Sequence, residues 1–486
     1  MESLKPVLAV LARVLIGFSF AFVVPLLWAW AADDAWLVQV WAASFAATLA
    51  SGWLLARAMR RSRRELMPKD GFLLVNLVWV VLPAYSAAPL MFTVPGIDVA
   101  RAYFEAMSAL TATGATALSG LDTLPVSVNV WRCFLQFIGG LGIILLVVAV
   151  LPLLGLGGMQ LYRAETPGPM KDAKLTPRIA ETARGLWTVY FVLSAACLLA
   201  YRWAGMSWAD AFMHMCTTMG LGGFSSHDAS FGHWNSPAIE WVAIVFMTLA
   251  GVAFARYFIV WRSRSALPLL RDAEVRAYGL VLLASIALLT VMLLAHGVYD
   301  DPAEGLRTAA FQVVSLATTT GYASTDYLLW PAFAPVLLLF LGCFVSCAGS
   351  TGGGIKMVRM LLLIKQARRE LVRIVHPRVV NPVTLGGSTV PATVTAAVMA
   401  YMLIYGASIV GLTFLLLLSG LDLVTAFSAV IACVNNIGPG LGQVGPASNF
   451  GVLNDFQTWV CSFAMMLGRL ELLSVMVLFT AQFWRK

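Results

Sequence analysis

Apolar segments long enough to cross a membrane recur along this chain, separated by short polar connections. The first two, residues 7–30 and 36–58, flank an acidic turn at 31–34 and predict a helical hairpin. None of the long segments alternates apolar and polar residues, which excludes a transmembrane barrel. Because a helix needs about 20 residues to cross the hydrocarbon core, the pattern predicts an all-α polytopic membrane protein with about ten transmembrane helices.

Beyond residue 69, a unit of four parts recurs four times. Each copy has a long apolar helix, a shorter amphipathic helix, a stretch rich in Thr, Gly and Ser, and a second long apolar helix. The first long helices are expected at 71–92, 179–203, 275–296 and 390–418. The short helices are expected at 98–110, 208–217, 302–317 and 423–433. The second long helices are expected at 131–154, 239–261, from 332 onward, and at 453–483.

These units divide the chain into an N-terminal hairpin and four pore repeats. Copies two and three align without gaps, and this register places Gly223 opposite Gly321; the equivalents in copies one and four are Gly114 and Gly438. The expected boundaries are 1–69 for the hairpin and 70–160, 161–265, 266–380 (with an intramembrane loop) and 381–486 for the repeats.

Composition and charge exclude a soluble protein and set the orientation. Hydrophobic residues make up 60% of the chain and charged residues only 12%. The net charge of +8 comes from basic residues in short connections, which favours membrane topology over nucleic-acid binding. The connections around 57–69, 162–184, 262–276 and 365–378 carry most of the Lys and Arg. By the positive-inside rule they are expected in the cytoplasm, together with both termini.

The four irregular stretches point to one aqueous pathway. They read TATGAT at 111–116, MGLGGFS at 219–225, TTTGYAS at 318–324 and NNIGPGL at 435–441. Non-helical backbone at membrane depth is tolerated only where it is buried in protein or lines water. A ring of backbone carbonyls can replace the hydration shell of an alkali cation, and glycine allows the chain to turn those carbonyls inward. The short helices would direct their negative C-terminal ends at the same place, favouring cations.

The predicted selectivity filter binds K⁺ through residues of all four copies. The expected ion-binding residues are Thr113, Gly114, Gly222, Gly223, Thr320, Gly321, Ile437 and Gly438. Asp122, Asp228 and Asp326 follow the loops and would concentrate cations at the outer mouth; alternatively, they only solvate those loops. The alternative for the glycines is close helix–helix packing through small residues.

A second glycine-rich run predicts a gate. Residues 347–356, CAGSTGGGIK, interrupt the second long helix of copy three. Glycine costs about 1 kcal/mol relative to alanine inside a helix, so a loop within the membrane is expected, with a simple helix end as the alternative. The gate residues are Gly349, Ser350, Thr351, Gly352, Gly353 and Gly354, joined by Arg469.

Arg469 is a charge within the apolar run 463–479. Intramembrane charges are costly and usually face a cavity or a partner. Glu471 is two residues away, on another side of the helix, so the two do not face each other. We expect Arg469 to point at the pathway, and the alternative is a salt bridge elsewhere.

These stretches, together with CAGSTGGGIK, closely resemble the Trk/Ktr/HKT superfamily of K⁺ transporters, and the TrkH branch in particular. The resemblance extends over nearly the whole chain and implies a Trk-type uptake system for K⁺, with Na⁺ as a further candidate ion. It also implies a homodimer in the plasma (inner) membrane, one pore per subunit, and a cytosolic TrkA-like regulatory ring. The chain has no nucleotide-binding fingerprint, so NAD or ATP is expected on that partner and no cofactor on this chain.

Two other classes of function compete with an ion pathway. An intramembrane enzyme would need paired catalytic groups, but the five histidines show no metal-ligand spacing. A symporter for an organic substrate would show inverted halves, whereas these repeats are parallel and fourfold. The sequence therefore predicts a cation transport protein that is not an enzyme, and leaves open channel-like or H⁺- or Na⁺-coupled transport.

Overall fold

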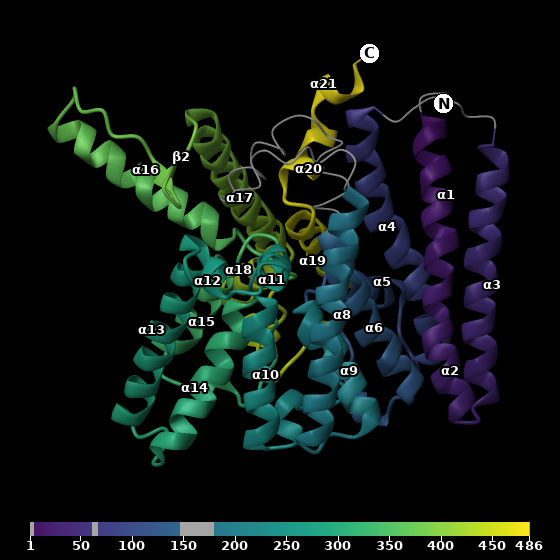
Figure 1. The fold of residues 1–486 in the computed structure, drawn as a ribbon. Helices are drawn as coiled ribbons and strands as arrows, with labels where there is room; N and C mark the ends of the chain where they lie inside the picture. The colour runs from purple at the N-terminus through teal and green to yellow at the C-terminus, as the bar shows by residue number, and fades with distance from the viewer. Residues whose placement is uncertain (1–3, 61–66, 146–178, 486) are drawn as a thin grey trace.

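The computed structural model describes residues 4–60, 67–145 and 179–485. Within these residues the chain is almost entirely helical (Figure 1), and the only strands are the short antiparallel pair β1 (Thr384–Leu385) and β2 (Ser388–Thr389). Among the described residues, six helices are long and apolar enough to span a membrane, or eight if each of two bent pairs is one span. The all-α polytopic prediction is confirmed.

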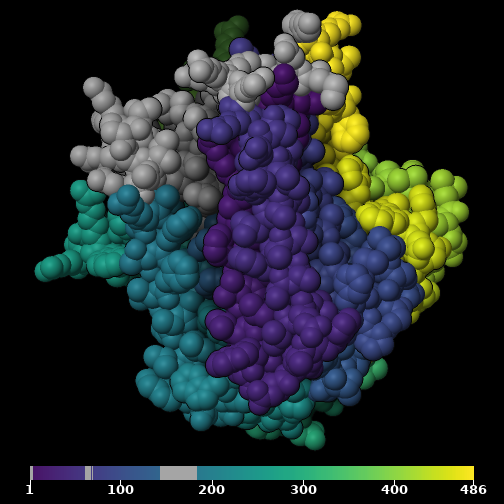
Figure 2. All heavy atoms as spheres, turned by 90° about the vertical axis from the view of Figure 1, so that its right-hand side faces the viewer, coloured from purple at the N-terminus to yellow at the C-terminus, as the bar shows by residue number. Residues whose placement is uncertain are grey.

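The N-terminal hairpin consists of α1 (Lys5–Ser19), which continues through η2 (Phe20–Phe22) into α2 (Val23–Ala31), and of α3 (Ala35–Ala58). Asp34 accepts a hydrogen bond from the Leu37 N–H and so caps α3 at the predicted acidic turn. The hairpin covers one face of the molecule (Figure 2, purple), where Phe22 stacks on Trp131 with ring centroids 4.5 Å apart. It is therefore an outer layer against the first repeat.

Each later copy contains the predicted long and short helices. The first long helices are α4 (Pro68–Thr93), α8 (Ile179–Trp203), α13 (Ala273–Ala295) and α17 (Ala392–Leu418). The short helices are α5 (Val99–Leu110), α9 (Trp208–Gly220), α14 (Pro302–Ala317) and α18 (Leu423–Val434). A side-chain oxygen caps the N-terminus of every short helix: Asp98, Ser207, Asp301 and Asp422. These caps fix where each short helix begins.

The second long helices differ most from prediction. In copy one, α6 (Val126–Leu145) starts five residues early, and the rest of the predicted 131–154 helix lies outside the described residues. In copy two, the expected continuous helix 239–261 is wrong: α10 (Pro237–Ala250) and α11 (Phe254–Ser263) meet at 86°. The break lies at Gly251, where a side chain would collide with the Tyr278 hydroxyl.

Copies three and four also break midway. As predicted, α15 (Phe333–Gly342) gives way to non-helical chain before α16 (Met357–Val375) begins. The continuous helix expected at 453–483 is wrong, because α19 (Asp455–Arg469) is followed by a bend of 109°. Glu471 and Leu472 adopt positive φ values of 56° and 39° there, which no α-helix contains. Arg469 and Glu471 interrupt the apolar run at this bend, but a charge within an apolar run does not by itself predict a helix break.

Two short elements, α20 (Leu473–Met476) and α21 (Ala481–Trp484), follow that bend, and the short helix α12 (Leu267–Leu270) precedes α13. The two ends of the chain lie at the same end of the molecule as α16, which projects away from the bundle (Figure 1). The hairpin turn lies at the opposite end. The predicted loop at 162–184 lies largely outside the described residues.

Candidate ion pathway

All four short helices end in the same backbone motif. One residue just past each helix adopts a left-handed conformation, with φ between 50° and 62°. It is the second residue after α5, α14 and α18 and the first after α9: Ala112, Thr319, Asn436 and Leu221. The following N–H in each copy reaches back to a carbonyl five residues earlier, as Thr113 does to Ser108 at 2.8 Å and Ile437 does to Ala432 at 2.8 Å. This is the Schellman arrangement, which usually has glycine at the left-handed position.

The glycine that follows is left-handed in every copy. Gly114, Gly223, Gly321 and Gly438 have φ values of 83°, 73°, 86° and 104°. Other residues rarely adopt such values, so the four predicted glycines have a conformational reason to be there. The repeat is thus present in the backbone itself and not only in the sequence.

The four motifs close into a ring. A methyl group added to Gly114 would collide with the carbonyl oxygen of Gly222, and one added to Gly223 would collide with that of Thr320. At Gly321 it would meet the Ile437 carbonyl, and at Gly438 it would lie 3.0 Å from the Thr113 oxygen. Each copy therefore contacts the next in chain order, and the fourth contacts the first. All eight predicted filter residues lie in this ring.

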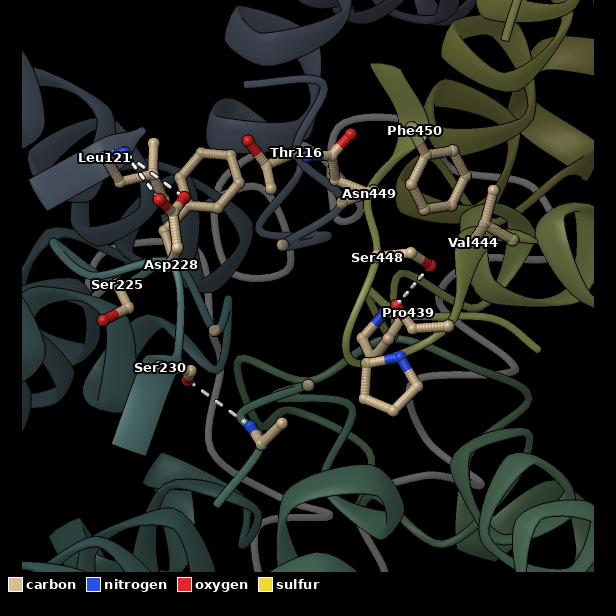
Figure 3. A pocket seen from close by; sticks show the side chains of 18 of the residues that line it. Thr116, Leu121, Ser225, Asp228, Ser230, Pro439, Val444, Ser448, Asn449 and Phe450 are labelled. Carbon is tan, nitrogen blue, oxygen red and sulfur yellow. Dashed lines mark hydrogen bonds between the residues drawn. The ribbon is translucent and has the colours of Figure 1, made fainter. Parts of the chain in front are cut away.

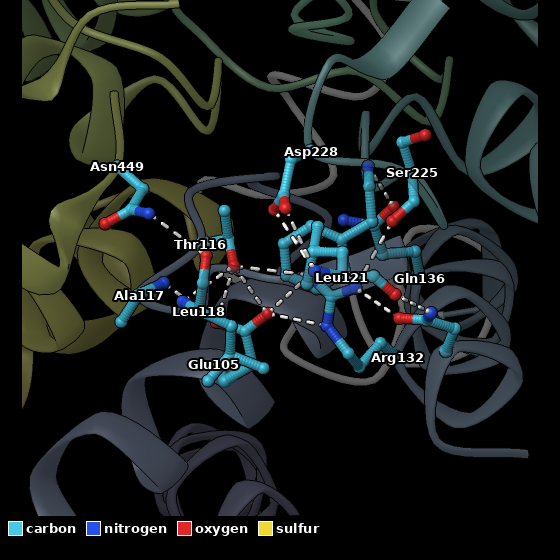
Figure 4. A network of polar contacts seen from close by, with 12 residues as sticks. Glu105, Thr116, Ala117, Leu118, Leu121, Arg132, Gln136, Ser225, Asp228 and Asn449 are labelled. Carbon is cyan, nitrogen blue, oxygen red and sulfur yellow. Dashed lines mark hydrogen bonds and ion pairs between the residues drawn. The ribbon is translucent and has the colours of Figure 1, made fainter. Parts of the chain in front are cut away.

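A buried ion pair supports the ring between the first two copies (Figure 4). Glu105 on α5 and Arg132 on α6 are both almost fully buried, with Oε1 and Nη2 2.7 Å apart. Glu105 also accepts from Thr116 and from the Ala117 N–H, while Arg132 donates to the Ser225 carbonyl. This pair was not predicted from the sequence. The signal that could have revealed it is a Glu and an Arg on two neighbouring helices of the first copy.

Other polar side chains brace the filter stretches differently in each copy. The Gln136 amide donates to the Gly222 carbonyl at 2.8 Å and accepts from the Phe224 N–H at 3.1 Å. The Tyr322 hydroxyl lies between the Thr217 and Thr218 hydroxyls at the end of α9. The braces hold neighbouring copies together, so the stretches are not free loops.

Outside the ring, a pocket opens between the loops (Figure 3), with a cavity volume of about 80 Å³. Gly114, Gly223 and Gly321 line it, together with Arg132 and Asp228. We call this cavity the vestibule. It lies where the sequence predicts the outer mouth of a pathway.

The three predicted mouth acids are engaged in loop structure. Asp228 accepts from the N–H groups of Gly120 and Leu121, at 2.9 and 3.2 Å, which joins the first two copies. Asp326 caps η7 (Tyr327–Leu329) by accepting from Leu328. Asp122 hydrogen-bonds with His227. Of the three acids, Asp228 also lines the vestibule.

The Asp122–His227 contact changes both pKa values. Partial burial raises the pKa of Asp122, but hydrogen bonds from His227 and the Asp228 N–H outweigh it, and the net pKa is lowered. Burial lowers the pKa of His227, but hydrogen bonds with Asp210 and Asp122 raise it overall.

On the other side of the ring, the predicted loop lies beneath the ends of three short helices. The Thr351 hydroxyl donates to the Met219 carbonyl of α9 at 2.9 Å, and the Gly353 N–H donates to the Thr319 hydroxyl at 2.7 Å. A side chain at Gly353 would collide with the Asn435 carbonyl after α18. The loop is buried and packed, and it is not a simple helix end.

Arg469 ties this loop to the remaining copy. Its guanidinium donates to the Thr351 carbonyl and to the Gly139 carbonyl of α6, both at 2.9 Å. Its partners in the described part of the chain are backbone carbonyls. Glu471 instead pairs with Arg359 at 2.8 Å. Arg469 therefore contacts the predicted gate loop, and it forms no salt bridge with any residue that the structure describes.

Comparison with known proteins identifies the family. A model of the TrkH family, described as a cation transport protein, matches residues 37–486. The chain is 43% identical to the Trk system potassium uptake protein TrkH of Halomonas elongata, over 100% of both chains. It is 46% identical to the protein of that name from Vibrio parahaemolyticus, over 88% of each. The chain belongs to the TrkH family.

The structural comparison agrees with this assignment. The crystal structure of the potassium transporter TrkH from Vibrio parahaemolyticus matches with a TM-score of 0.91 at 39% sequence identity. The match covers 99% of both chains. Membership of the TrkH family confirms the resemblance noted above and the class of cation transport protein, and it decides against an intramembrane enzyme.

Proposed function

We propose that this TrkH-family protein takes up K⁺ across the plasma (inner) membrane through the ring described above. The proposed filter residues are Thr113, Gly114, Gly222, Gly223, Thr320, Gly321, Ile437 and Gly438. The observation that carries the proposal is the closure of four equivalent carbonyls, one from each copy, into one ring. The names of the relatives, which are potassium uptake proteins, support the choice of ion.

The surroundings of the ring suit a bare cation. Carbonyl oxygens can replace the water ligands of K⁺. The four short helices end at the ring, and each contributes a partial negative charge of about half an electron there. The Thr113 and Thr320 hydroxyls bond to those of Thr111 and Thr318, at 2.7 Å in both cases, and add further oxygens nearby.

We propose that residues 349–354 and Arg469 form the gate. The loop lies directly beneath the ends of α9, α14 and α18, and Arg469 connects it to α6. An ion leaving the ring toward this side would meet the loop. Glycines at 349 and 354, with φ of 79° and 77°, give its two ends conformational freedom.

The assembly we propose is a homodimer regulated by a cytosolic TrkA-like ring, on which NAD or ATP would bind. The Trk system named for the relatives supports a multi-component uptake system. The basic helix α16 projects from the end of the molecule that holds both termini (Figure 1), which supports a cytoplasmic location for that end. No cofactor on this chain is proposed, and K⁺ is the cargo.

The test is ion flux in liposomes that contain only this protein, comparing wild type with Gly321→Ser. A side chain at Gly321 would collide with the Ile437 carbonyl and with Pro439, so the ring carbonyl must shift. We expect Na⁺ flux to rise relative to K⁺ while membrane insertion is retained. Gly297→Ser is the matched control, because Gly297 is also left-handed, with φ of 64°, but has open space around it.

Unchanged K⁺ to Na⁺ permeability in Gly321→Ser, with normal insertion, would remove this residue from the filter. Equal changes in both variants would show that backbone strain alone, and not the ring, decides selectivity. Absence of cation flux in wild-type liposomes both with and without the regulatory partner would contradict the proposed function.

A further inference from the structure

Three potential metal ligands meet at the rim of the vestibule. Asp122 comes from η3 (Leu121–Thr123) in the first copy, while His227 and His233 follow the filter stretch of the second, with His233 at the end of η6 (Ser230–His233). One ligand atom from each lies within 4.8 Å of the other two. The site is open to the outside, since the side chains of Asp122 and His233 are each 43% exposed. The pathway as proposed makes no use of this cluster.

The cluster contains the types of ligand that bind zinc. Two imidazole nitrogens and one carboxylate form a three-ligand set that leaves a fourth tetrahedral position for water. The Nδ1 atoms of His227 and His233 both lie near the Asp122 carboxylate, and the two imidazole rings stack with centroids 3.5 Å apart. A metal binds in the plane of an imidazole ring, so the exposed His233 side chain, whose Nδ1 is 3.8 Å from Asp122, must rotate out of the stack to share one ion with His227.

A second carboxylate stands behind His227. Asp210 Oδ1 lies 3.4 Å from the His227 Nε2, close enough for an ion pair but without a well-aligned hydrogen bond between them. Metal-binding histidines usually donate their other ring N–H to such a group, which leaves the facing nitrogen free for the metal. Asp210 is itself held by the hydroxyls of Ser226 and Ser207, at 2.8 and 2.6 Å. A carboxylate is therefore in place to accept the Nε2 proton of His227 when Nδ1 binds the metal.

The cluster is also placed to influence ion entry. His227 and Asp228 line the vestibule, and Asp228 is bonded through its N–H to Asp122. A divalent cation here would add positive charge beside the opening through which K⁺ enters. It would also tie the loops of the first two copies together.

We propose that Asp122, His227 and His233 bind Zn²⁺ from the outside and that the bound ion inhibits K⁺ uptake. The inhibition rests on the proposed function, whereas the binding does not. Nitrogen ligands favour Zn²⁺ over Mg²⁺ and Ca²⁺, which prefer oxygen. This site could not be predicted from the sequence, because Asp122 is distant along the chain and two histidines six positions apart match no ligand motif.

Binding is measured by titrating Zn²⁺ into the purified full-length protein, without a polyhistidine tag, in a calorimeter. We expect one saturable site in the wild type and none for Mg²⁺. His233→Gln and Asp122→Asn should weaken the affinity about tenfold or more. His296→Gln is the matched control, because His296 is an exposed histidine at the end of α13 that lies outside the cluster. Gel-filtration profiles confirm that each variant is folded.

Inhibition is measured as K⁺ uptake with Zn²⁺ outside. The half-inhibiting concentration should rise about tenfold or more in His233→Gln and stay unchanged in His296→Gln. Absence of a saturable site, or equal affinity in all variants, would overturn the proposal. If Zn²⁺ binds but does not inhibit K⁺ uptake by an active protein, the proposed inhibition is wrong. If Zn²⁺ binds but no variant conducts K⁺ at all, the failure belongs to the proposed function instead.

Discussion

The ring and the loop beneath it are both built from irregular, glycine-rich backbone, but they are held in different ways. Each ring stretch is anchored by the same backbone hydrogen bond to its own helix and by buried side chains such as Arg132, Gln136 and Tyr322. The loop at 349–354 is held instead by hydrogen bonds to several other elements, through Phe254, Met219, Thr319 and Arg469. We predict that the loop moves while the ring stays in place, because these bonds can break without unwinding a short helix.

The largest effect should come from removing an anchor of the ring. Arg132→Met leaves Glu105 buried without its ion-pair partner, which costs about 3–5 kcal/mol of folding free energy. We expect a loss of folded protein, followed as a lower melting temperature in detergent. The double variant with Glu105→Gln removes both charges and should recover much of the stability. Wild-type stability in Arg132→Met alone would show that the pair does not anchor the ring.

Deleting residues 349–354 should give the next largest effect, but on flux and not on selectivity. The ring glycines are untouched, so the ratio of K⁺ to Na⁺ permeability should stay constant while basal flux rises. Dependence on the regulatory partner should weaken. Flux in liposomes with and without that partner measures the basal flux and its dependence on the partner. If the deletion variant assembles normally but its flux stays low and partner-dependent, the loop is not the gate.

Arg469→Ala should raise cation flux by a smaller amount. The substitution removes a positive charge and two hydrogen bonds. A hydrogen bond with a charged donor contributes about 1.5–3 kcal/mol to stability. Arg469→Lys keeps the charge but loses the two-pronged donor geometry of the guanidinium, so its cation flux should lie between the fluxes of Arg469→Ala and wild type. The readout is flux per folded protein. Reduced expression with unaltered flux would assign Arg469 a purely structural role.

The smallest effect is expected for Thr351→Val, which removes the hydroxyl that bonds to the Met219 carbonyl. A neutral hydrogen bond contributes about 0.5–1.5 kcal/mol, so basal flux should rise roughly 2- to 10-fold. Thr413→Val is the control, because the Thr413 hydroxyl is buried without a partner among the described residues. Equal flux in the two variants would mean that this bond does not hold the loop closed.

Local signals allowed prediction of most helices and of the eight ring residues. The caps at Asp98 and Asp422 begin the short helices where the pattern predicts, and the four glycines are marked by their matching contexts. The bend at Gly251 was missed because apolar residues continue through it, and the bend at Leu472 was missed although Arg469 and Glu471 interrupt the apolar run there. The Glu105–Arg132 pair was missed because its members lie on different helices, and pairing across helices depends on tertiary packing.

The closure of the ring in chain order gives three of its four junctions visibly different chemistry. One junction contains Gln136, another contains Tyr322, and in the junction between the last copy and the first the Asn436 amide bonds to the Thr113 hydroxyl at 2.9 Å. In a channel of four identical subunits, one substitution alters every junction at once. Here a substitution alters a single junction, so one side of the proposed ion site can change while the other three stay intact.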